Sequence, residues 1–238
     1  MSWSRRRFLG STAALLSGCG TAMRRFPFDQ GSTTNDSPGL EITYYSVGCF
    51  LLRWQGTAVL TDPFWSHLPF RQVAFGKTPS DPAQVDATLS QLSEVETVLV
   101  GHSHYDHVLD LPYVAPHLAL DATVLGSQTL AHTLAPLELP LQVQAVNAQS
   151  ATPEQPGQWI PVSDQVRVLP IASGHPNNYA FIHLWTDELA EDRKTPPTRA
   201  SHFQEGRTLA FLVDFLDQDH IVHRIYIQTS SRGYPDGF

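Results

Sequence analysis

Lysine and long apolar runs are the scarcest features of this 238-residue sequence. Only two lysines occur, Lys77 and Lys194, and charged residues make up 16% of the chain, with a formal net charge of -8 at pH 7. A nucleic-acid-binding surface needs clustered basic side chains that neutralise phosphates, and no such cluster follows the first 25 residues. The composition therefore excludes nucleic acid as an expected partner.

Cysteine is also scarce. Cys19 lies in an N-terminal segment typical of an export signal, and Cys49 lies in an apolar stretch that we expect to form a strand. Two cysteines in an oxidising compartment could form a disulfide, but these positions lead us to expect none. Hydrophobic residues account for 42% of the chain, which is enough for one sizeable core and predicts a single globular domain.

The first 19 residues have the three parts of an export signal. Arg5, Arg6 and Arg7 are followed by a short apolar run over residues 10–16 and then by Leu-Ser-Gly-Cys, which ends at Cys19. Such a run is too short to cross a bilayer as a helix. The arginines followed by Phe-Leu resemble a twin-arginine signal, and Leu-Ser-Gly-Cys resembles a bacterial lipobox. These resemblances imply that Cys19 becomes the lipidated first residue of the mature protein.

Residues 20–39 are rich in Gly, Ser, Thr, Asn, Asp and Pro without an apolar period, and they predict a flexible tether. The folded domain is expected over residues 40–238. This order predicts an exported protein, held through Cys19 to the periplasmic side of a bacterial membrane. The alternative is a cytosolic protein with a basic, unstructured start.

The expected domain alternates strands with amphipathic helices. Residues 41–54 and 57–64 predict two strands joined at Gln55-Gly56, and residues 79–92 predict a helix. A second helix is expected over residues 128–137, and further strands are expected over 96–100, 122–127, 142–148, 158–162, 165–175, 207–215 and 223–231. Hairpins mixed with helices between strands indicate an α/β fold with two sheets sandwiched by helices.

The strongest chemical signal is the run His102-Ser103-His104-Tyr105-Asp106-His107, directly after the apolar strand. Two histidines separated by one residue at a strand end can point their imidazoles at one position, and Asp106 and His107 add two ligands. That density favours one metal or a metal pair over packing. A solvated histidine-rich loop is the alternative, but it would explain neither the buried strand nor the aspartate.

The H-x-H-x-D-H run after an apolar strand resembles the signature of the metallo-β-lactamase superfamily. The resemblance implies a four-layer αβ/βα sandwich, in which His102 and His104 help to bind one metal while Asp106 and His107 help to bind the other. It also implies one or two zinc ions, with manganese or iron as alternatives. Asp106 would then be the catalytic residue that orients a metal-bound hydroxide.

Two further positions are similar to family site residues. Asp62 follows an apolar strand and is similar to an aspartate that supports the metal ligands through hydrogen bonds; turn formation before Pro63 is its alternative role. His175 follows a predicted strand and Gly174 and is similar to a further histidine ligand of the family, the alternative being a surface histidine.

The sequence departs from the family pattern near its end. The family usually has an aspartate that bridges the two metals after a late strand, whereas Gln228-Thr229-Ser230 stands here. A hydroxyl at Thr229 would bind a second dication more weakly than a carboxylate would. The last family histidine is also not reached before Phe238. We therefore expect either a weak or lost second metal or a domain truncated at its C-terminus.

These features predict a metal-dependent hydrolase that cleaves an ester, lactone or phosphodiester. The motif and the early Thr-Asp-Pro resemble the branch that includes N-acylphosphatidylethanolamine phospholipase D and the ascorbate-6-phosphate lactonases, which implies a small-molecule or lipid substrate. The alternatives are a non-catalytic metal-binding or interaction protein with a degenerate site, and β-lactam hydrolysis. Packing or surface roles are expected for the histidines outside the site, which are His67, His117, His132, His183, His202, His220 and His223. The alternative for His67 and His202 is contact with a substrate from their loops.

Overall fold

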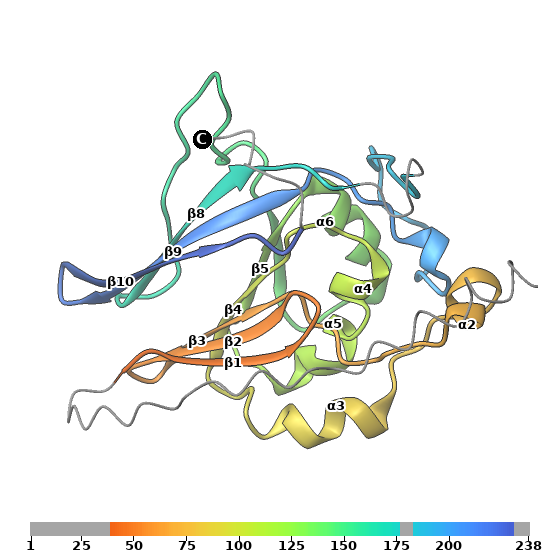
Figure 1. The fold of residues 1–238 in the computed structure, drawn as a ribbon, viewed down its shortest axis with the longest axis horizontal. Helices are drawn as coiled ribbons and strands as arrows, with labels where there is room; N and C mark the ends of the chain where they lie inside the picture. The colour runs from red at the N-terminus through yellow and green to blue at the C-terminus, as the bar shows by residue number, and fades with distance from the viewer. Residues whose placement is uncertain (1–38, 177–182, 231–238) are drawn as a thin grey trace, which may run out of the picture. The chain divides into compact units, whose positions relative to one another are not determined.

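Two β-sheets lie face to face in the computed structural model, which describes residues 39–176 and 183–230 (Figure 1). The six-stranded sheet has the order β1 (Glu41–Ser46), β2 (Cys49–Trp54), β3 (Thr57–Thr61), β4 (Val95–Leu99), β5 (Thr123–Gly126) and β6 (Gln142–Ala145). The four-stranded sheet has the order β10 (His220–Ile227), β9 (Leu209–Asp217), β8 (Val166–Ala172) and β7 (Ile160–Pro161).

The six-stranded sheet is antiparallel at one end and parallel at the other. Strands β1, β2 and β3 pair antiparallel, whereas β3, β4, β5 and β6 pair parallel. All five residues of β3 are buried, because this central strand is covered on both faces. The parallel arrangement brings the carboxyl ends of β3 and β4 to the same edge of the sheet, where the candidate site begins.

The prediction of one strand over residues 41–54 was wrong. A two-residue turn at Val47 and Gly48 divides it into β1 and β2, with Ser46 paired to Cys49. Val47 has a φ of 44°, a backbone conformation that β-branched residues rarely adopt. The predicted strand at 96–100 and the predicted helix at 79–92 correspond to β4 and to α3 (Pro82–Leu89), with Val85 buried on α3.

Helices cover one face of the six-stranded sheet, and the four-stranded sheet covers the other (Figure 1). Side chains of β2, β3 and β4 pack against α3, α4, α5 and α6 in one core cluster. A second cluster joins Leu52, Val59 and Leu99 to Phe211 and Phe215 of β9. The helical elements are α2 (Phe70–Phe75), α3, α4 (Tyr105–Val108), α5 (Leu111–Val114), η1 (Ala115–His117), α6 (Gln128–Leu134), η2 (Ala135–Leu137) and η3 (Ala200–His202).

The outer face of the four-stranded sheet carries a charged cluster. The Asp214 carboxylate is fully buried and accepts hydrogen bonds from Arg224 at 2.6 and 2.8 Å and from Arg167 at 2.9 Å. Both guanidinium groups also lie over the Trp159 ring, with that of Arg167 4.5 Å and that of Arg224 5.4 Å from the ring centre. Burial alone would raise the pKa of Asp214, but the two arginines outweigh it and lower that pKa below its usual value.

The expected signal, Cys19 and nearly all of the expected tether lie outside the described residues. Within residues 39–176 and 183–230, no helix combines the length and the apolar character needed to span a bilayer. The expected α/β sandwich is confirmed.

Candidate metal centre

The site lies where several strands of both sheets end. Asp62 follows β3 and His102 follows β4, while His175 follows β8 and Thr229 follows β10. Strands β8 and β10 both run antiparallel to β9, so their carboxyl ends share an edge. A hydrogen bond of 2.7 Å from the Leu209 amide to the Gly101 carbonyl joins that edge to the end of β4. Residues far apart in the sequence therefore meet at one place.

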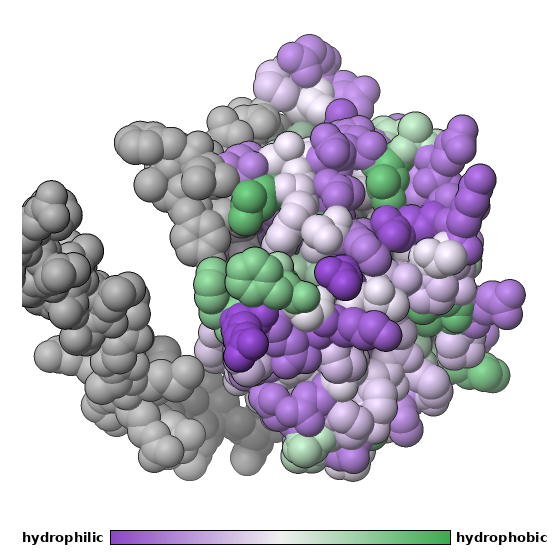
Figure 2. All heavy atoms as spheres, turned by 90° about the vertical axis from the view of Figure 1, so that its right-hand side faces the viewer, coloured by the Kyte–Doolittle hydropathy of each residue, from purple (hydrophilic) through white to green (hydrophobic). Residues whose placement is uncertain are grey.

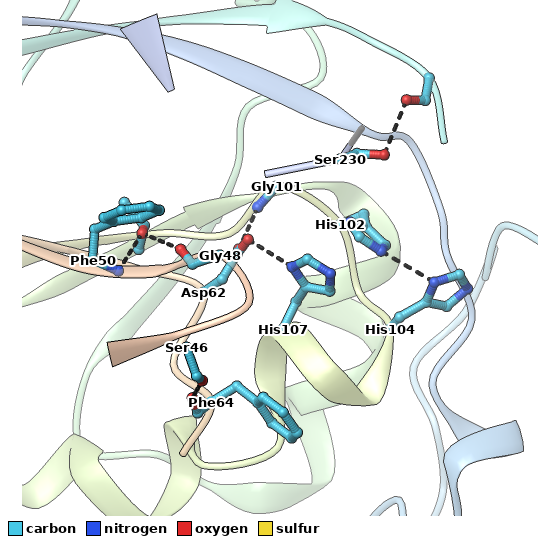
Figure 3. A network of polar contacts seen from close by, with 12 residues as sticks. Ser46, Gly48, Phe50, Asp62, Phe64, Gly101, His102, His104, His107 and Ser230 are labelled. Atoms are coloured by element: carbon cyan, nitrogen blue, oxygen red, sulfur yellow. Dashed lines mark hydrogen bonds and ion pairs between the residues drawn. The ribbon is translucent and has the colours of Figure 1, made fainter. Parts of the chain in front are cut away.

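Three histidines converge there. His102, His104 and His175 each offer a ring nitrogen, and these nitrogens lie within 4.8 Å of one another. His102 Nε2 lies 3.1 Å from His104 Nδ1 (Figure 3). The ring of His175 has its centre 4.6 Å from that of His102 and 5.0 Å from that of His104. The backbone turn after β4 thus places two imidazoles of the motif opposite a third from the other sheet.

His104 and His175 each contact a backbone carbonyl through one ring nitrogen, which leaves the other nitrogen available to a metal ion. His104 Nε2 lies 3.4 Å from the Trp185 carbonyl, and His175 Nδ1 lies 2.5 Å from the Pro176 carbonyl, so both carbonyls select the tautomer that donates from those atoms. Metal-binding histidines in proteins have this kind of second contact. The buried Nδ1 of His102 has no hydrogen-bond partner among the described residues.

Burial keeps these imidazoles neutral. It lowers the pKa of His102 far below the usual value, and the neighbouring His107 lowers that pKa further. Burial also lowers the pKa of His104 to about 4, and it lowers the pKa of His175. Since only neutral imidazole binds a metal, the three rings are in the required protonation state at neutral pH.

His107 differs from this group because it pairs with Asp62. Its Nδ1 lies 2.6 Å from Asp62 Oδ2, while Asp62 Oδ1 accepts a hydrogen bond of 2.8 Å from the Gly101 amide (Figure 3). Burial lowers the pKa of His107, but the Asp62 carboxylate outweighs burial and raises that pKa. Asp62 has a φ of 36°, a backbone conformation in which its side chain reaches both partners. The His107 ring centre lies 3.9 Å from that of His102.

Asp106 lies beside the converging histidines. It is half-buried on α4 and lines a cavity of about 410 Å³ together with His104. It belongs to neither of the groups of three converging ligands found in residues 39–176 and 183–230. The rest of the cavity lining is mostly apolar and comprises Phe70, Val73, Ala74, Tyr105, Leu184 and Trp185.

Thr229 lies next to Asp62. A side chain at Gly48 would place its Cβ 2.5 Å from Asp62 Oδ2 and 2.7 Å from Thr229 Cβ, and one at Gly101 would collide with Thr229 Oγ1. Both positions therefore require glycine. The Thr229 hydroxyl is buried and has no hydrogen-bond partner in the described part of the chain.

Two residues near the site had no signal in the sequence. His183 and Glu205 contact each other, with His183 Nε2 2.5 Å from Glu205 Oε2, and His183 stacks on His175 with ring centres 5.1 Å apart. We expected a packing or surface role for His183. Neither residue lies in a recognisable motif, so only the folded chain shows their proximity.

Two packed sheets with histidines converging at their strand ends define an α/β sandwich protein with a candidate metal centre. The model of the β-lactamase superfamily domain matches residues 57–221, and the chain belongs to this superfamily. Its fold is the αβ/βα sandwich of the metallo-β-lactamase type. No protein of curated function matches the chain significantly.

Solved structures of the same fold are distant. A metallo hydrolase from Ignicoccus hospitalis is 14% identical with a TM-score of 0.43, and the match covers 79% of this chain and 60% of that one. A possible metal-dependent hydrolase from Veillonella parvula is 13% identical with a TM-score of 0.47, covering 81% and 63%. An isothiocyanate hydrolase from Delia radicum gut bacteria is 14% identical with a TM-score of 0.46, covering 82% and 64%. This chain thus spans less than two thirds of each.

Proposed function

We propose that this chain is a metal-dependent hydrolase that cleaves an ester, lactone or phosphodiester carrying an apolar group. The observation that supports it best is the convergence of His102, His104 and His175 beside an aromatic-lined cavity. Membership of the β-lactamase superfamily agrees with this class of reaction.

The residues present fit a metal ion. Three neutral imidazoles with oriented ring nitrogens form a donor set typical of zinc, and manganese or iron also accept imidazole. One or two ions are proposed. When bound, such a dication lowers the pKa of a coordinated water to about 7 and so supplies a nucleophile at neutral pH.

The chain's own residues would position the reactants. Asp106 lines the cavity together with His104, so its carboxylate would orient the attacking water and accept its proton. His107 donates from Nδ1 to Asp62, so in the neutral ring Nε2 carries the lone pair that a further metal ligand needs. Asp62 therefore acts on the centre through His107 and the Gly101 amide.

The cavity favours an acyl or other apolar substituent on the substrate. The lining includes Phe70 and Val73 of α2 and also Trp185, whose ring centre lies 6.2 Å from that of His104. Hydrophobic and hydrophilic side chains adjoin on the face that carries α2 (Figure 2). Aromatic side chains next to a polar centre suit a molecule with an apolar part and a hydrolysable head.

If Cys19 carries the proposed lipid anchor, a lipid is the substrate that we expect. An exported protein tied to the periplasmic side of a bacterial membrane would meet phospholipids or their acyl derivatives at high local concentration. The motif's resemblance to the phospholipase D and lactonase branch supports the same substrate class. Nucleic acid is not proposed as a partner, because basic side chains are few.

The test is turnover by the zinc-loaded full chain on a lactone, a carboxylic ester and a phosphodiester, each with a short and a long acyl or alkyl group. We expect hydrolysis of at least one class, faster for the long form, and its loss in His102→Ala/His104→Ala. Exposed His117→Ala is the matched control and should keep full activity. Absence of turnover on every class by a metal-loaded chain would overturn the proposal.

A non-catalytic metal-binding protein is the second candidate. Thr229 favours it, because a hydroxyl lies next to Asp62 at the position where the family usually has a bridging carboxylate. Tight zinc binding without turnover in the assay above would support this candidate.

A further inference from the structure

A second group of potential metal ligands lies beside the motif. His175 and His183 each offer a ring nitrogen, and Glu205 offers a carboxylate oxygen. These three atoms lie within 4.8 Å of one another. His183 and Glu205 do not belong to the H-x-H-x-D-H signature. They come from the segment between β8 and β9, which approaches the centre from the four-stranded sheet.

The backbone holds Glu205 firmly in this position. Its amide donates to the Trp185 carbonyl at 2.7 Å, and its carbonyl accepts from the Ser103 amide at 3.0 Å. The Thr208 hydroxyl donates to Glu205 Oε1 at 3.0 Å, which turns Oε2 towards His183. Only 7% of Glu205 is exposed, so this carboxylate oxygen is withdrawn from water.

The contact between Glu205 and His183 leaves both atoms available. Glu205 Oε2 and His183 Nε2 lie 2.5 Å apart, yet both are buried and neither has an aligned hydrogen bond in the part of the chain that the structure describes. Buried polar atoms without an aligned partner are destabilising unless something else binds them. A cation bound by both atoms would satisfy both. Two ligand atoms about 2.1 Å from one tetrahedral ion lie about 3.3 Å apart, so the two side chains would separate slightly to bind it.

His175 can complete this group. Because its Nδ1 contacts the Pro176 carbonyl, Nε2 is the one nitrogen left with a lone pair. A ring nitrogen of His175 lies within 4.8 Å of ring nitrogens of His102 and His104, and one lies within 4.8 Å of a ring nitrogen of His183 and a carboxylate oxygen of Glu205. A single lone pair binds one ion at a time, so when both ions are bound His175 completes only one of the two groups and the other ion keeps two ligands from its own group.

We propose that His183 and Glu205, together with His175, bind a divalent metal ion of the zinc class. Two imidazoles and one carboxylate are a donor set that proteins use for zinc and for ferrous iron. The site provides a carboxylate ligand in a chain that has Thr229 where the family usually has one. It requires metal binding but not turnover, so its failure is separate from failure of the proposed hydrolase activity.

The test is binding of zinc and cobalt(II) to the full chain, followed by metal analysis and cobalt absorption. Glu205→Gln keeps the shape of the side chain and its acceptor for Thr208, and His183→Ala removes the imidazole. We expect each variant to bind one equivalent less than the unchanged chain, or to bind that equivalent with an affinity lowered by more than about tenfold. Wild-type stoichiometry and affinity in both variants would overturn the site.

A second measurement isolates the group. His102→Ala/His104→Ala, checked for folding by circular dichroism, should retain one equivalent of cobalt, and adding Glu205→Gln should remove it. A folded double variant that binds no cobalt would contradict the proposal; if the double variant is unfolded, the two single variants decide. Glu188→Gln and His117→Ala, both exposed, are the matched controls and should bind as the unchanged chain does.

Discussion

Replacing Asp62 with alanine removes two interactions from the buried end of β3. The Gly101 amide loses its acceptor at 2.8 Å and His107 Nδ1 loses its partner at 2.6 Å, while Asp62 itself is fully buried. An unpaired buried polar group costs about 1 to 3 kcal/mol, and loss of one partner of a buried ion pair costs about 3 to 5 kcal/mol. We therefore expect the free energy of unfolding to fall by about 3 to 5 kcal/mol.

Asp62→Asn should cost less than half of that amount. The asparagine Oδ1 can still accept from Gly101, and asparagine tolerates the φ of 36° at this position better than alanine does. In a domain of this size, the alanine variant should melt about 10 °C or more below the unchanged chain. Zinc affinity should fall about 10- to 100-fold in both variants, because His107 is no longer oriented.

The assay is urea unfolding of the metal-free full chain at pH 7, followed by circular dichroism. Exposed Asp121→Ala is the control and should unfold at the same urea concentration as the unchanged chain. A fall of less than about 1 kcal/mol in Asp62→Ala would refute the claim that this carboxylate organises the strand ends. The single variant His107→Ala and the double variant Asp62→Ala/His107→Ala complete a double-mutant cycle, which measures how much of the loss belongs to their contact.

Three further predictions concern other parts of the chain. Arginines hold the pKa of Asp214 in the folded chain below 3.8, so the stability that this carboxylate contributes is present above pH 3.8 and is lost as the pH falls through the pKa of the folded state. In Asp214→Asn, the free energy of unfolding measured in urea should therefore depend less on pH between pH 2 and 5. Trp185→Ala should raise KM about tenfold for a long-chain substrate and leave KM for the short form unchanged. Ser127→Ala removes the oxygen that accepts from the Leu130 amide at 3.2 Å and should destabilise the chain by about 1 kcal/mol in urea, an effect absent in Ser127→Thr.

Much of the fold could be predicted from the sequence because its strands are short apolar runs bounded by turn residues. The strands of both sheets and α6 occur close to their expected positions. The turn at Val47 was missed because valine favours strands and rarely adopts positive φ, so nothing but the neighbouring Gly48 indicated it. The helix α2 was missed for a similar reason, since it buries none of its residues and has no apolar period to detect.

The sequence could predict ligands only where they lie within one short motif or directly after a recognisable strand. His102 and His104 meet because the chain turns locally after β4, and His175 was indicated by Gly174 at the end of a predicted strand. Asp62 and His107 are 45 residues apart, and only the parallel pairing of β3 and β4 explains their contact. His183 and Glu205 had no such indication, because their proximity depends on backbone contacts of Glu205 with Trp185 and Ser103.

Because a ligand such as Glu205 can lie outside any motif, Thr229 alone does not establish that a metal site is lost. A threonine next to Asp62 shows the loss of a metal site only if no other carboxylate reaches the centre. Glu205 is such a carboxylate, buried and held within 4.8 Å of the ring nitrogens of His175 and His183. If it binds a metal, the ligand set has moved from the strand end after β10 to the segment before β9, and the sequence pattern alone would misclassify the centre as degenerate. If it binds none, its contact with His183 only stabilises that segment, and the hydroxyl at position 229 limits the chain to the one ion that we propose for His102, His104 and His175.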